Sequence, residues 1–179
     1  MILFFGPAGA GKSVQGQFLG IRRGWQWVSS GNMLRATDDP EIQADLKKGL
    51  LISSEKMYRL FDAVFQKTGS EQVILDGFPR KVEQAQWLYE NQSRYGYTID
   101  LAVVIDVSEE EVIKRMSARG RADDSPEAVA ERLRIYHQEN EPILTFLEQK
   151  DIPIARVNGV GQIGLIHETI NEEVDLVLE

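Results

Sequence analysis

The chain has 179 residues, of which 42% are hydrophobic, and it carries 20 basic against 28 acidic side chains, for a formal net charge of −8 at pH 7. This size and composition predict one folded domain and exclude a disordered or fibrous protein, while an acidic chain is a poor partner for nucleic acids and acidic membrane surfaces. Because there is no cysteine, disulfide frameworks, thiolate zinc sites and cysteine nucleophiles are excluded, and a bound metal would rest on oxygen ligands.

Short apolar runs with helical segments between them predict five buried parallel strands, at residues 2–5, 25–28, 73–75, 101–107 and 152–157. Helix start signals support this alternation. Ser108 stands three residues before Glu111 in a capping box, and Ser125 precedes Pro126, which suits the first position of a long helix ending near residue 149. The pattern predicts an α/β fold in three layers, with a parallel sheet flanked by helices.

One part of the chain departs from the alternation. Residues 29–67 are helical by pattern throughout, too long for a single crossover, and predict a small helical insert. Residues 90–100 and 119–124 predict surface connections. No repeat or flexible linker divides the chain, so we predict one domain whose core comprises residues 1–28, 68–118 and 125–179.

A phosphate-binding motif follows the first predicted strand. Residues 6–13 read Gly-Pro-Ala-Gly-Ala-Gly-Lys-Ser, which fits the G-x-x-x-x-G-K-[ST] pattern of a P-loop between a strand and a helix. The glycines let several backbone N–H groups face one point, the helix beginning near Lys12 adds its positive end, and the lysine reaches the phosphates. Ser13 is placed to bind Mg²⁺. The motif predicts a P-loop NTPase-like fold that binds a nucleoside triphosphate.

A carboxylate and an arginine follow the third predicted strand. Asp76 lies at the carboxyl edge of this strand, where an acid can face the metal of a phosphate site, although it could instead cap a helix. Arg80 follows four residues later and adds a cation to the same rim, which favours the metal-side interpretation.

These motifs resemble those of the adenylate kinase family, and the resemblance runs nearly end to end. The family pattern adds to the P-loop a Ser-Thr-Gly-Asp-Met-Leu-Arg stretch, an Asp-Gly-Phe-Pro-Arg stretch and lid arginines. Here residues 29–35 read Ser-Ser-Gly-Asn-Met-Leu-Arg, residues 76–80 match fully, and residues 49–52 match the glycine-led segment that lines the monophosphate base. The resemblance implies reversible, Mg²⁺-dependent transfer between nucleotides, ATP + AMP giving two ADP, in nucleotide biosynthesis and homeostasis.

The resemblance also implies a role for each matching position. The ATP site would comprise Gly9, Ala10, Gly11, Lys12, Ser13, Val14, Arg115, Arg119 and Gly161. The AMP site would comprise Ser30, Arg35, Leu50, Leu51, Ile52, Gly77, Phe78, Pro79, Arg80, Gln84, Arg121 and Arg132. The catalytic cations would be Lys12, Arg80, Arg119, Arg121 and Arg132, and Mg²⁺ would rest on Ser13 and Asp76, largely through water. Residues 29–67 would bind AMP, and residues 119–124 would form the lid.

Phosphoryl transfer makes such a set of residues sensible. The reaction needs donor and acceptor in line, water excluded and negative charge neutralised, and it needs no general base because the acceptor phosphate is already ionised. Arginine binds two oxygens with its planar fork and stays charged. We therefore expect seven cations to converge in an acidic chain, namely Lys12, Arg35, Arg80, Arg115, Arg119, Arg121 and Arg132.

Four departures from the family pattern qualify the resemblance. Ser13-Val14 replaces the usual Gly-Thr after the P-loop lysine, and Asn32 replaces the usual aspartate beside the acceptor site. The third departure is Ser30, which replaces the usual threonine but keeps its hydroxyl. Related pyrimidine kinases typically have alanine at the place of Ser30 and asparagine at the place of Gln84, so both residues favour AMP.

The fourth departure is the lid, which is cut to six residues without the metal-binding residues of some relatives. We expect no zinc. Asp123 and Asp124 would orient the lid arginines by ion pairing, or simply solvate a turn. With so short a lid, hinge motion of residues 29–67 would carry much of the exclusion of water.

Two other functions remain open: a kinase for another monophosphate, such as UMP, CMP or a deoxynucleotide, and an ATP-binding sensor that has lost transfer. We expect a soluble, cytoplasmic protein that binds ATP, AMP and ADP, because no apolar stretch is long enough to span a bilayer. We also expect a monomer, because no exposed apolar stripe is evident. His137 and His167 are expected to be structural or solvated.

Overall fold

The computed structural model describes residues 1–68 and 72–178. Five parallel strands form one sheet in the order β2-β3-β1-β4-β5. Their bounds are β1 (Ile2–Phe5), β2 (Gln26–Ser29), β3 (Val73–Asp76), β4 (Leu101–Asp106) and β5 (Ile154–Asn158). The P-loop strand β1 is central, and Phe4 stands level with Asp76 of β3 on one side and Val103 of β4 on the other. The predicted five-stranded parallel sheet is confirmed, with strand ends shifted by one or two residues.

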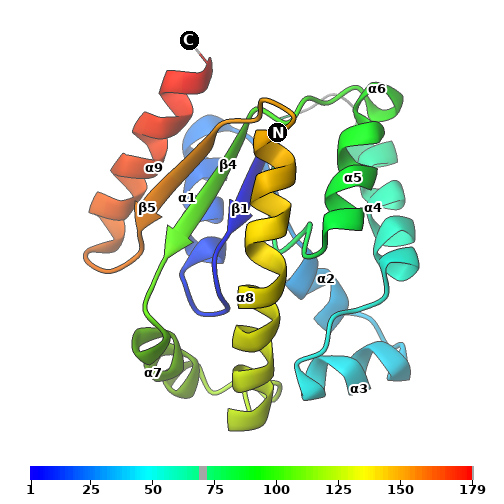
Figure 1. The fold of residues 1–179 in the computed structure, drawn as a ribbon, viewed down its shortest axis with the longest axis vertical. Coiled ribbons are helices and arrows are strands. Elements are labelled where there is room, and N and C mark those ends of the chain that lie inside the picture. The colour runs from blue at the N-terminus through cyan, green and yellow to red at the C-terminus, as the bar shows by residue number, and fades with distance from the viewer. Residues whose placement is uncertain (69–71, 179) are drawn as a thin grey trace.

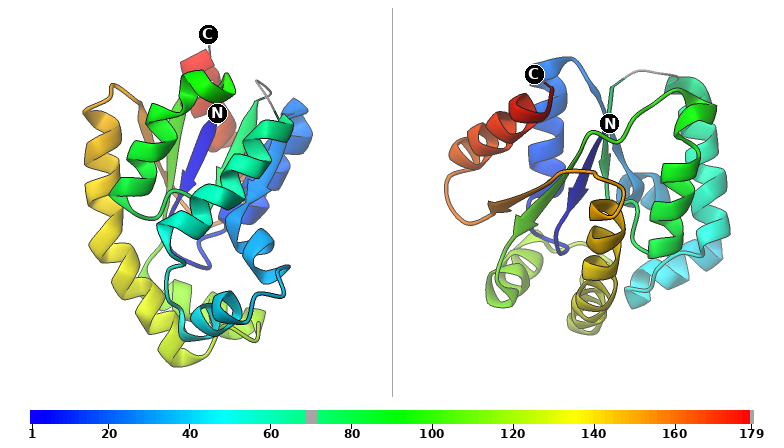
Figure 2. Two further views of the ribbon diagram at one scale, coloured as in Figure 1. Left: turned by 90° about the vertical axis from the view of Figure 1, so that its right-hand side faces the viewer. Right: turned by 45° about the horizontal axis from the view of Figure 1, so that its top comes forward.

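Helices cover both faces of this sheet (Figures 1 and 2). Helices α1 and α9 lie on one face, and α4, α5 and α8 on the other, which confirms the three-layer arrangement. The helix bounds are α1 (Lys12–Arg23), α2 (Ser30–Arg35), α3 (Pro40–Lys48), α4 (Ser54–Thr68), α5 (Val82–Glu90), α6 (Gln92–Tyr95), α7 (Glu109–Arg119), α8 (Pro126–Glu148) and α9 (Ile163–Leu178). The start of β1 and the end of α9 lie at the same end of the molecule (Figure 1).

The sheet is buried on both faces because successive side chains of a strand point in opposite directions. In β1, Leu3 and Phe5 pack into the core beneath α4, α5 and α8, whereas Ile2 and Phe4 pack into the core beneath α1 and α9. All four side chains are at most 6% exposed. This burial fixes the position of β1, and with it the loop that follows.

The predicted helix starts are confirmed by their caps. The Ser108 hydroxyl accepts a hydrogen bond from the backbone N–H of Glu111 at 3.4 Å, and the Ser125 hydroxyl accepts one from Ala128 at 3.2 Å. Pro126 occupies the first turn of α8, as expected.

The helical insert that the sequence predicts at residues 29–67 is interrupted twice. Three helices occupy the segment, and two breaks separate them. Asp39 caps the start of α3, and Gly49 ends it in a left-handed conformation with φ of 75°. After Gly49, residues 50–53 belong to no helix or strand before α4 begins at Ser54.

Residues 90–100 are not the surface connection that the sequence predicted. Every second residue from Tyr95 points inward, and Tyr95, Tyr97 and Ile99 are 6–8% exposed within the main core. The Tyr97 hydroxyl donates to the backbone oxygen of Leu88 at 2.7 Å. Because polar residues alternate with these three positions, the sequence did not show that they face the core.

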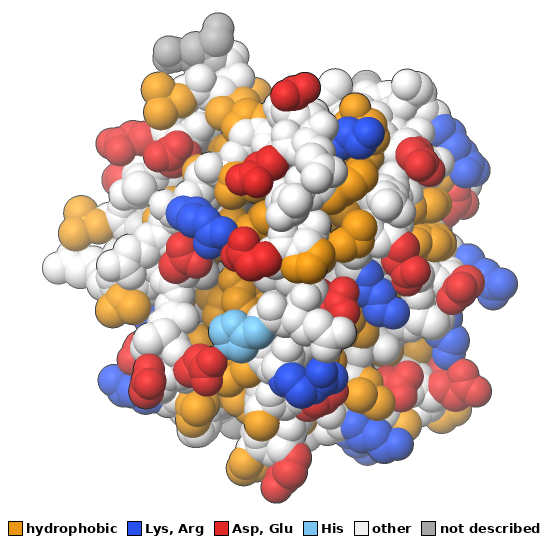
Figure 3. Space-filling view, in the orientation of Figure 1, with side chains coloured by type: hydrophobic (Ala, Val, Ile, Leu, Met, Phe, Trp, Pro, Cys, Tyr) orange, Lys and Arg blue, Asp and Glu red, His pale blue; other side chains and the backbone are white. Residues whose placement is uncertain are grey.

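The premise of the monomer prediction is also corrected. Val14, Phe18 and Ile21 occupy one face of α1, and they are 41%, 43% and 82% exposed. The oligomeric state itself stays a prediction. Acidic and basic side chains are interspersed over the face shown in Figure 3. Among the described residues, no helix combines the length and apolarity needed to cross a membrane.

Candidate functional site

A cavity of about 280 Å³ opens where the carboxyl ends of β1, β2 and β3 meet the helices of residues 29–67 and the connection between α7 and α8. Seven cationic side chains line it, against the carboxylates of Asp76 and Asp123. A chain with a net charge of −8 therefore holds a strongly positive cavity, which favours polyanionic ligands.

The P-loop forms one wall because its glycines adopt conformations that other residues avoid. Gly6, Gly9 and Gly11 have φ values of 137°, 85° and 103°. A Cβ on Gly6 would also lie 2.7 Å from the backbone oxygen of Ile105 in β4. Lys12, at the start of α1, donates hydrogen bonds to the backbone oxygens of Gly6 (2.7 Å) and Pro7 (2.8 Å).

The electrostatics of Lys12 follow from its burial. Desolvation lowers its pKa from 10.5 to about 8, the carboxylate of Asp76 opposes this, and the guanidinium groups of Arg80 and Arg119 add to it. A phosphate at this position would stabilise the charged form and raise the pKa again, so the desolvated lysine favours binding of an anion.

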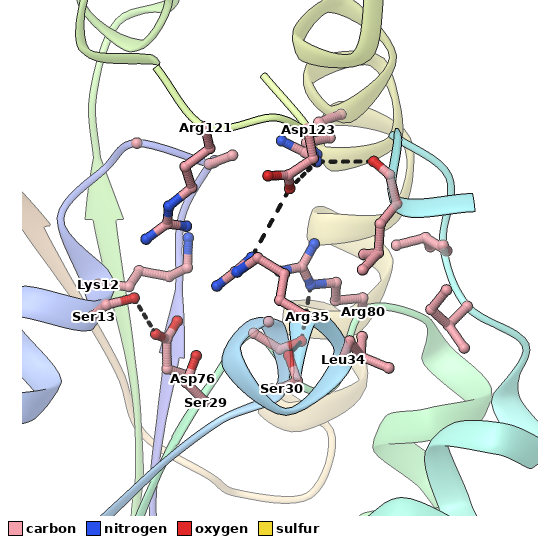
Figure 4. Close-up of a pocket in the computed structure, with 18 of the residues that line it drawn as sticks. Lys12, Ser13, Ser29, Ser30, Leu34, Arg35, Asp76, Arg80, Arg121 and Asp123 are labelled. Atoms are coloured by element: carbon pink, nitrogen blue, oxygen red, sulfur yellow. Dashed lines mark hydrogen bonds and ion pairs between the residues drawn. The ribbon is translucent and has the colours of Figure 1, made fainter. Parts of the chain in front are cut away.

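Ser13 and Asp76 join the P-loop to the end of β3. The Ser13 hydroxyl donates to the Asp76 carboxylate at 2.5 Å, and Asp76 is 4% exposed (Figure 4). A hydroxyl and a carboxylate are the hard oxygen ligands that suit Mg²⁺, which typically takes one or two protein groups and completes its octahedron with waters and phosphate oxygens. The donor set therefore fits magnesium bound together with a nucleotide.

Two arginines reach the cavity from the opposite wall. Arg80 Nε donates to the backbone oxygen of Gly77 at 2.8 Å, and burial lowers the pKa of its guanidinium. Arg35, at the end of α2, donates to the amide oxygen of Asn32 at 2.8 Å. In Figure 4, Lys12, Arg35 and Arg121 point towards one central space.

The lid is organised by ion pairs, which settles the alternative that the sequence left open. Asp124 binds Arg119 through two hydrogen bonds of 2.8 and 2.7 Å and Arg132 through one of 3.0 Å. Burial would raise the pKa of Asp124, but these arginines outweigh it and the net shift is downward. Asp123 contacts Arg132 at 2.7 Å and Arg35 at 4.0 Å, so it links the lid to α2.

Arg115, near the middle of α7, holds this helix against the P-loop. Its guanidinium donates to Glu111 at 2.8 Å, to the backbone oxygen of Gly159 at 3.0 Å and to that of Ala10 at 3.4 Å. The structure therefore brings together three segments that are far apart in the sequence. Gly161, two residues beyond Gly159, does not line the cavity.

The remaining wall of the cavity is apolar. It is formed by Leu34, Leu46, Leu50, Leu51, Ile52 and Met57. Two polar side chains interrupt it: Ser30, whose hydroxyl donates to the backbone oxygen of Gly77 at 2.7 Å, and Gln84, which is 2% exposed. An apolar wall with few polar groups suits a planar base.

Most residues that the sequence assigned to the site line this one cavity. Ala10, Phe78, Pro79 and Gly161 do not. Phe78 is 1% exposed and stacks on Phe61 in the core, so its contribution to a ligand is limited to the backbone. Pro79 lines a smaller adjacent cavity. The contacts with nucleotide expected of these four residues, a backbone contact in the case of Gly161, stay predictions that the lining of this cavity does not support.

Sequence reasoning missed three apolar residues of the wall. Leu34 lies inside the recognised 29–35 stretch and could have been found there. Leu46 and Met57 come from α3 and α4 and carry no local signal, because only the packing of these helices brings them to the cavity.

Comparisons with known proteins agree on one family. The family model described as adenylate kinase matches residues 4–152. The chain is similar to the adenylate kinase of Prochlorococcus marinus (strain MIT 9211), with 31% identity over 99% of this chain and 98% of that protein. It is also 34% identical to the adenylate kinase of Mycolicibacterium smegmatis, over 89% and 91% of the two chains, and 33% identical to that of Stenotrophomonas maltophilia, over 94% and 96%.

Proposed function

This chain belongs to the adenylate kinase family and is a phosphotransferase that binds nucleotides, and from that premise we propose that it transfers the terminal phosphoryl group of ATP to AMP, giving two ADP. The observation that carries the proposal is the cavity itself. Seven cations surround its centre, and an apolar wall with Ser30 and Gln84 adjoins them. Phosphates and a purine base can be accommodated together only where both environments meet.

The P-loop is the proposed donor side. Its backbone N–H groups and the start of α1 face the phosphates of ATP, and Lys12 exchanges its hydrogen bonds to Gly6 and Pro7 for bonds to phosphate oxygens. Mg²⁺ bound near Ser13 and Asp76 would neutralise charge on the phosphates and hold them in line. Arg115, which is held between the P-loop and Gly159, would contact the nucleoside of the donor.

Arg35 and Arg80 are the proposed clamp for the acceptor phosphate. Each guanidinium is held by one internal acceptor, Asn32 Oδ1 or Gly77 O, and keeps further N–H groups for phosphate oxygens. Both of these hydrogen-bond acceptors are neutral, while the Asp123 carboxylate lies 4.0 Å from Arg35 and offsets part of its positive charge. The acceptor oxygen is then positioned for in-line attack without a general base.

The lid supplies the charges that stabilise the transition state. Arg119 and Arg132 are held by Asp124, while Arg121 points into the cavity beside Lys12 (Figure 4). Because these guanidinium groups are positioned before the reaction, they can stabilise the phosphoryl group during its transfer with little reorganisation of the arginine side chains. A cytoplasmic monomer stays a prediction alongside this mechanism.

Product analysis tests the proposal. Purified protein is incubated with Mg·ATP and, separately, AMP, UMP, CMP, GMP and dTMP, with Lys12→Ala as the control. Rapid formation of ADP with AMP, lost in the variant, is the expected result. Turnover of a pyrimidine monophosphate instead would keep the mechanism and overturn the substrate. ATP binding without any turnover would contradict transfer and favour the sensor.

A further inference from the structure

A chain of hydrogen bonds lies directly behind the base-binding wall of the cavity. Ser54, the first residue of α4, is 5% exposed, accepts a hydrogen bond from Gln84 Nε2 at 3.3 Å and donates one to the carboxylate of Glu83. On the other side, Gln84 Oε1 accepts a hydrogen bond from the backbone N–H of Arg80 at 2.8 Å. Gln84 lines the cavity, whereas Ser54 and Glu83 do not.

The chemistry of these groups fixes the direction of every bond in the chain. A backbone N–H can only donate, so the amide oxygen of Gln84 must face Arg80. An ionised carboxylate can only accept, so Glu83 takes the single hydrogen of the Ser54 hydroxyl. Ser54 is left with lone pairs, and it therefore accepts from the amide nitrogen of Gln84. The two ends of the chain thus impose the same orientation on the Gln84 amide.

This orientation determines what Gln84 can offer to a base. One amide hydrogen and one oxygen lone pair are used internally, so one donor and one acceptor remain for the cavity. Adenine presents an acceptor at N1 and a donor at its 6-amino group. Hypoxanthine and guanine present the reverse, a donor at N1 and an acceptor at O6. A fixed amide matches one of these edges, and only a rotated amide matches the other.

We propose that Ser54 and Glu83 are positioning residues that hold the Gln84 amide in one orientation and thereby set the selectivity of the acceptor site for adenine over 6-oxopurines. The proposal rests on the proposed function, because it takes AMP as the acceptor. Neither residue touches the base. They act through Gln84, by making the rotated amide lose its hydrogen bonds within a buried site.

The experiment compares AMP with inosine monophosphate, which has the same ring size and the reversed hydrogen-bonding edge. Steady-state kcat and KM are measured for both with Mg·ATP, and Kd for both is measured by calorimetry without ATP. The variants are Ser54→Ala, which removes the acceptor for Gln84 Nε2, and Glu83→Lys, which removes the acceptor that fixes the Ser54 hydrogen and so leaves that hydrogen free to point towards Gln84. Ser53→Ala and Glu90→Lys are the controls, since Ser53 is the exposed neighbour of Ser54 and Glu90 is an exposed acid on α5.

We expect the preference for AMP over inosine monophosphate to fall about tenfold in Ser54→Ala and Glu83→Lys, in KM and in Kd, and to be unchanged in both controls. An equal loss for both nucleotides would show a merely structural role and overturn the proposal, as would an unchanged preference. Glu83 lies at the surface, so its variant decides the matter if Ser54→Ala fails to fold. A wild-type protein that neither binds nor converts AMP would refute the proposed function, and the inference with it.

Discussion

The hydroxyl of Ser13 donates to the carboxylate of Asp76 across 2.5 Å, joining residues 63 positions apart in the sequence. The contact exists because β1 and β3 are neighbours in the sheet and both end at the same edge. It gives the P-loop a fixed relation to the carboxylate before any ligand is bound.

We expect Asp76→Asn to lower kcat about 100-fold and to raise the Mg²⁺ concentration needed for half-maximal rate. The amide is isosteric and can still accept from Ser13, so the fold should persist while the negative charge facing the metal is lost. Asp106→Asn is the matched control, since Asp106 also ends a parallel strand, β4, but lies outside the cavity. Equal Mg²⁺ dependence in the two variants would contradict the role of Asp76.

Lys12 should make nucleotide binding pH-dependent. Its pKa in the free protein is lowered to about 8, and bound phosphate raises it again, so ATP binding near pH 8.5 should take up a proton. Calorimetry in buffers of different ionisation enthalpy measures this uptake, and Kd for ATP should rise as pH increases through 8. Lys12→Arg, which stays charged, should show neither effect.

The same shift has a consequence for stability. The unfolded chain, with an ordinary pKa near 10.5, binds more protons than the folded chain between about pH 8 and 10.5. Over that window the contribution of Lys12 to the free energy of unfolding therefore rises with pH. If the free energy of unfolding instead fell as pH increased over this window, and this fall were absent in Lys12→Met, the assigned direction of the pKa shift would be contradicted.

Local motifs predicted the charged half of the site well. Lys12, Ser13 and Asp76 lie in contiguous signatures at strand ends, and parallel strands bring such ends to one edge. The apolar half was predicted less completely, because Leu46 and Met57 reach the cavity only through the packing of α3 and α4. In the fold, the inward tyrosines of residues 90–100 were missed because their period of two lies among polar residues in a short segment.

Closure should involve residues 29–67 more than the short lid. In this structure Arg132 of α8 already donates to the backbone oxygen of Leu46 in α3 at 3.2 Å, and Asp123 of the lid lies 4.0 Å from Arg35 of α2, so residues 29–67 already contact the opposite side of the cavity. Since the chain has no native cysteine, spin labels can be placed at Lys48→Cys on α3 and Ser117→Cys on α7. We expect their distance distribution to narrow and shorten when a dinucleotide spanning both nucleotide sites is added.

A second label pair separates closure from general compaction. Gln86→Cys on α5 and Glu172→Cys on α9 report on the two layers that flank the sheet, and their distance should not change. If the pair on α3 and α7 is equally unchanged by the dinucleotide, residues 29–67 do not carry the exclusion of water.

Gly49 follows the last residue of α3 and lies against α8, next to residues 50–52 of the apolar cavity wall. Its φ is 75°, and a Cβ there would lie 2.5 Å from the backbone oxygen of Ala128, so alanine would be both strained and obstructed. Gly24 ends α1 in the same left-handed conformation, with φ of 67°, but a Cβ there would meet nothing within 4 Å. Gly24→Ala should cost about 1 kcal/mol of unfolding free energy from backbone strain alone. Gly49→Ala should cost about 3 kcal/mol, because α3 and α8 must also separate.

The separation displaces residues 50–52, so KM for AMP should rise several-fold in Gly49→Ala and stay unchanged in Gly24→Ala. Denaturant unfolding and steady-state kinetics measure both effects, and equal losses of stability in the two variants would show that the approach of Gly49 to Ala128 imposes no constraint.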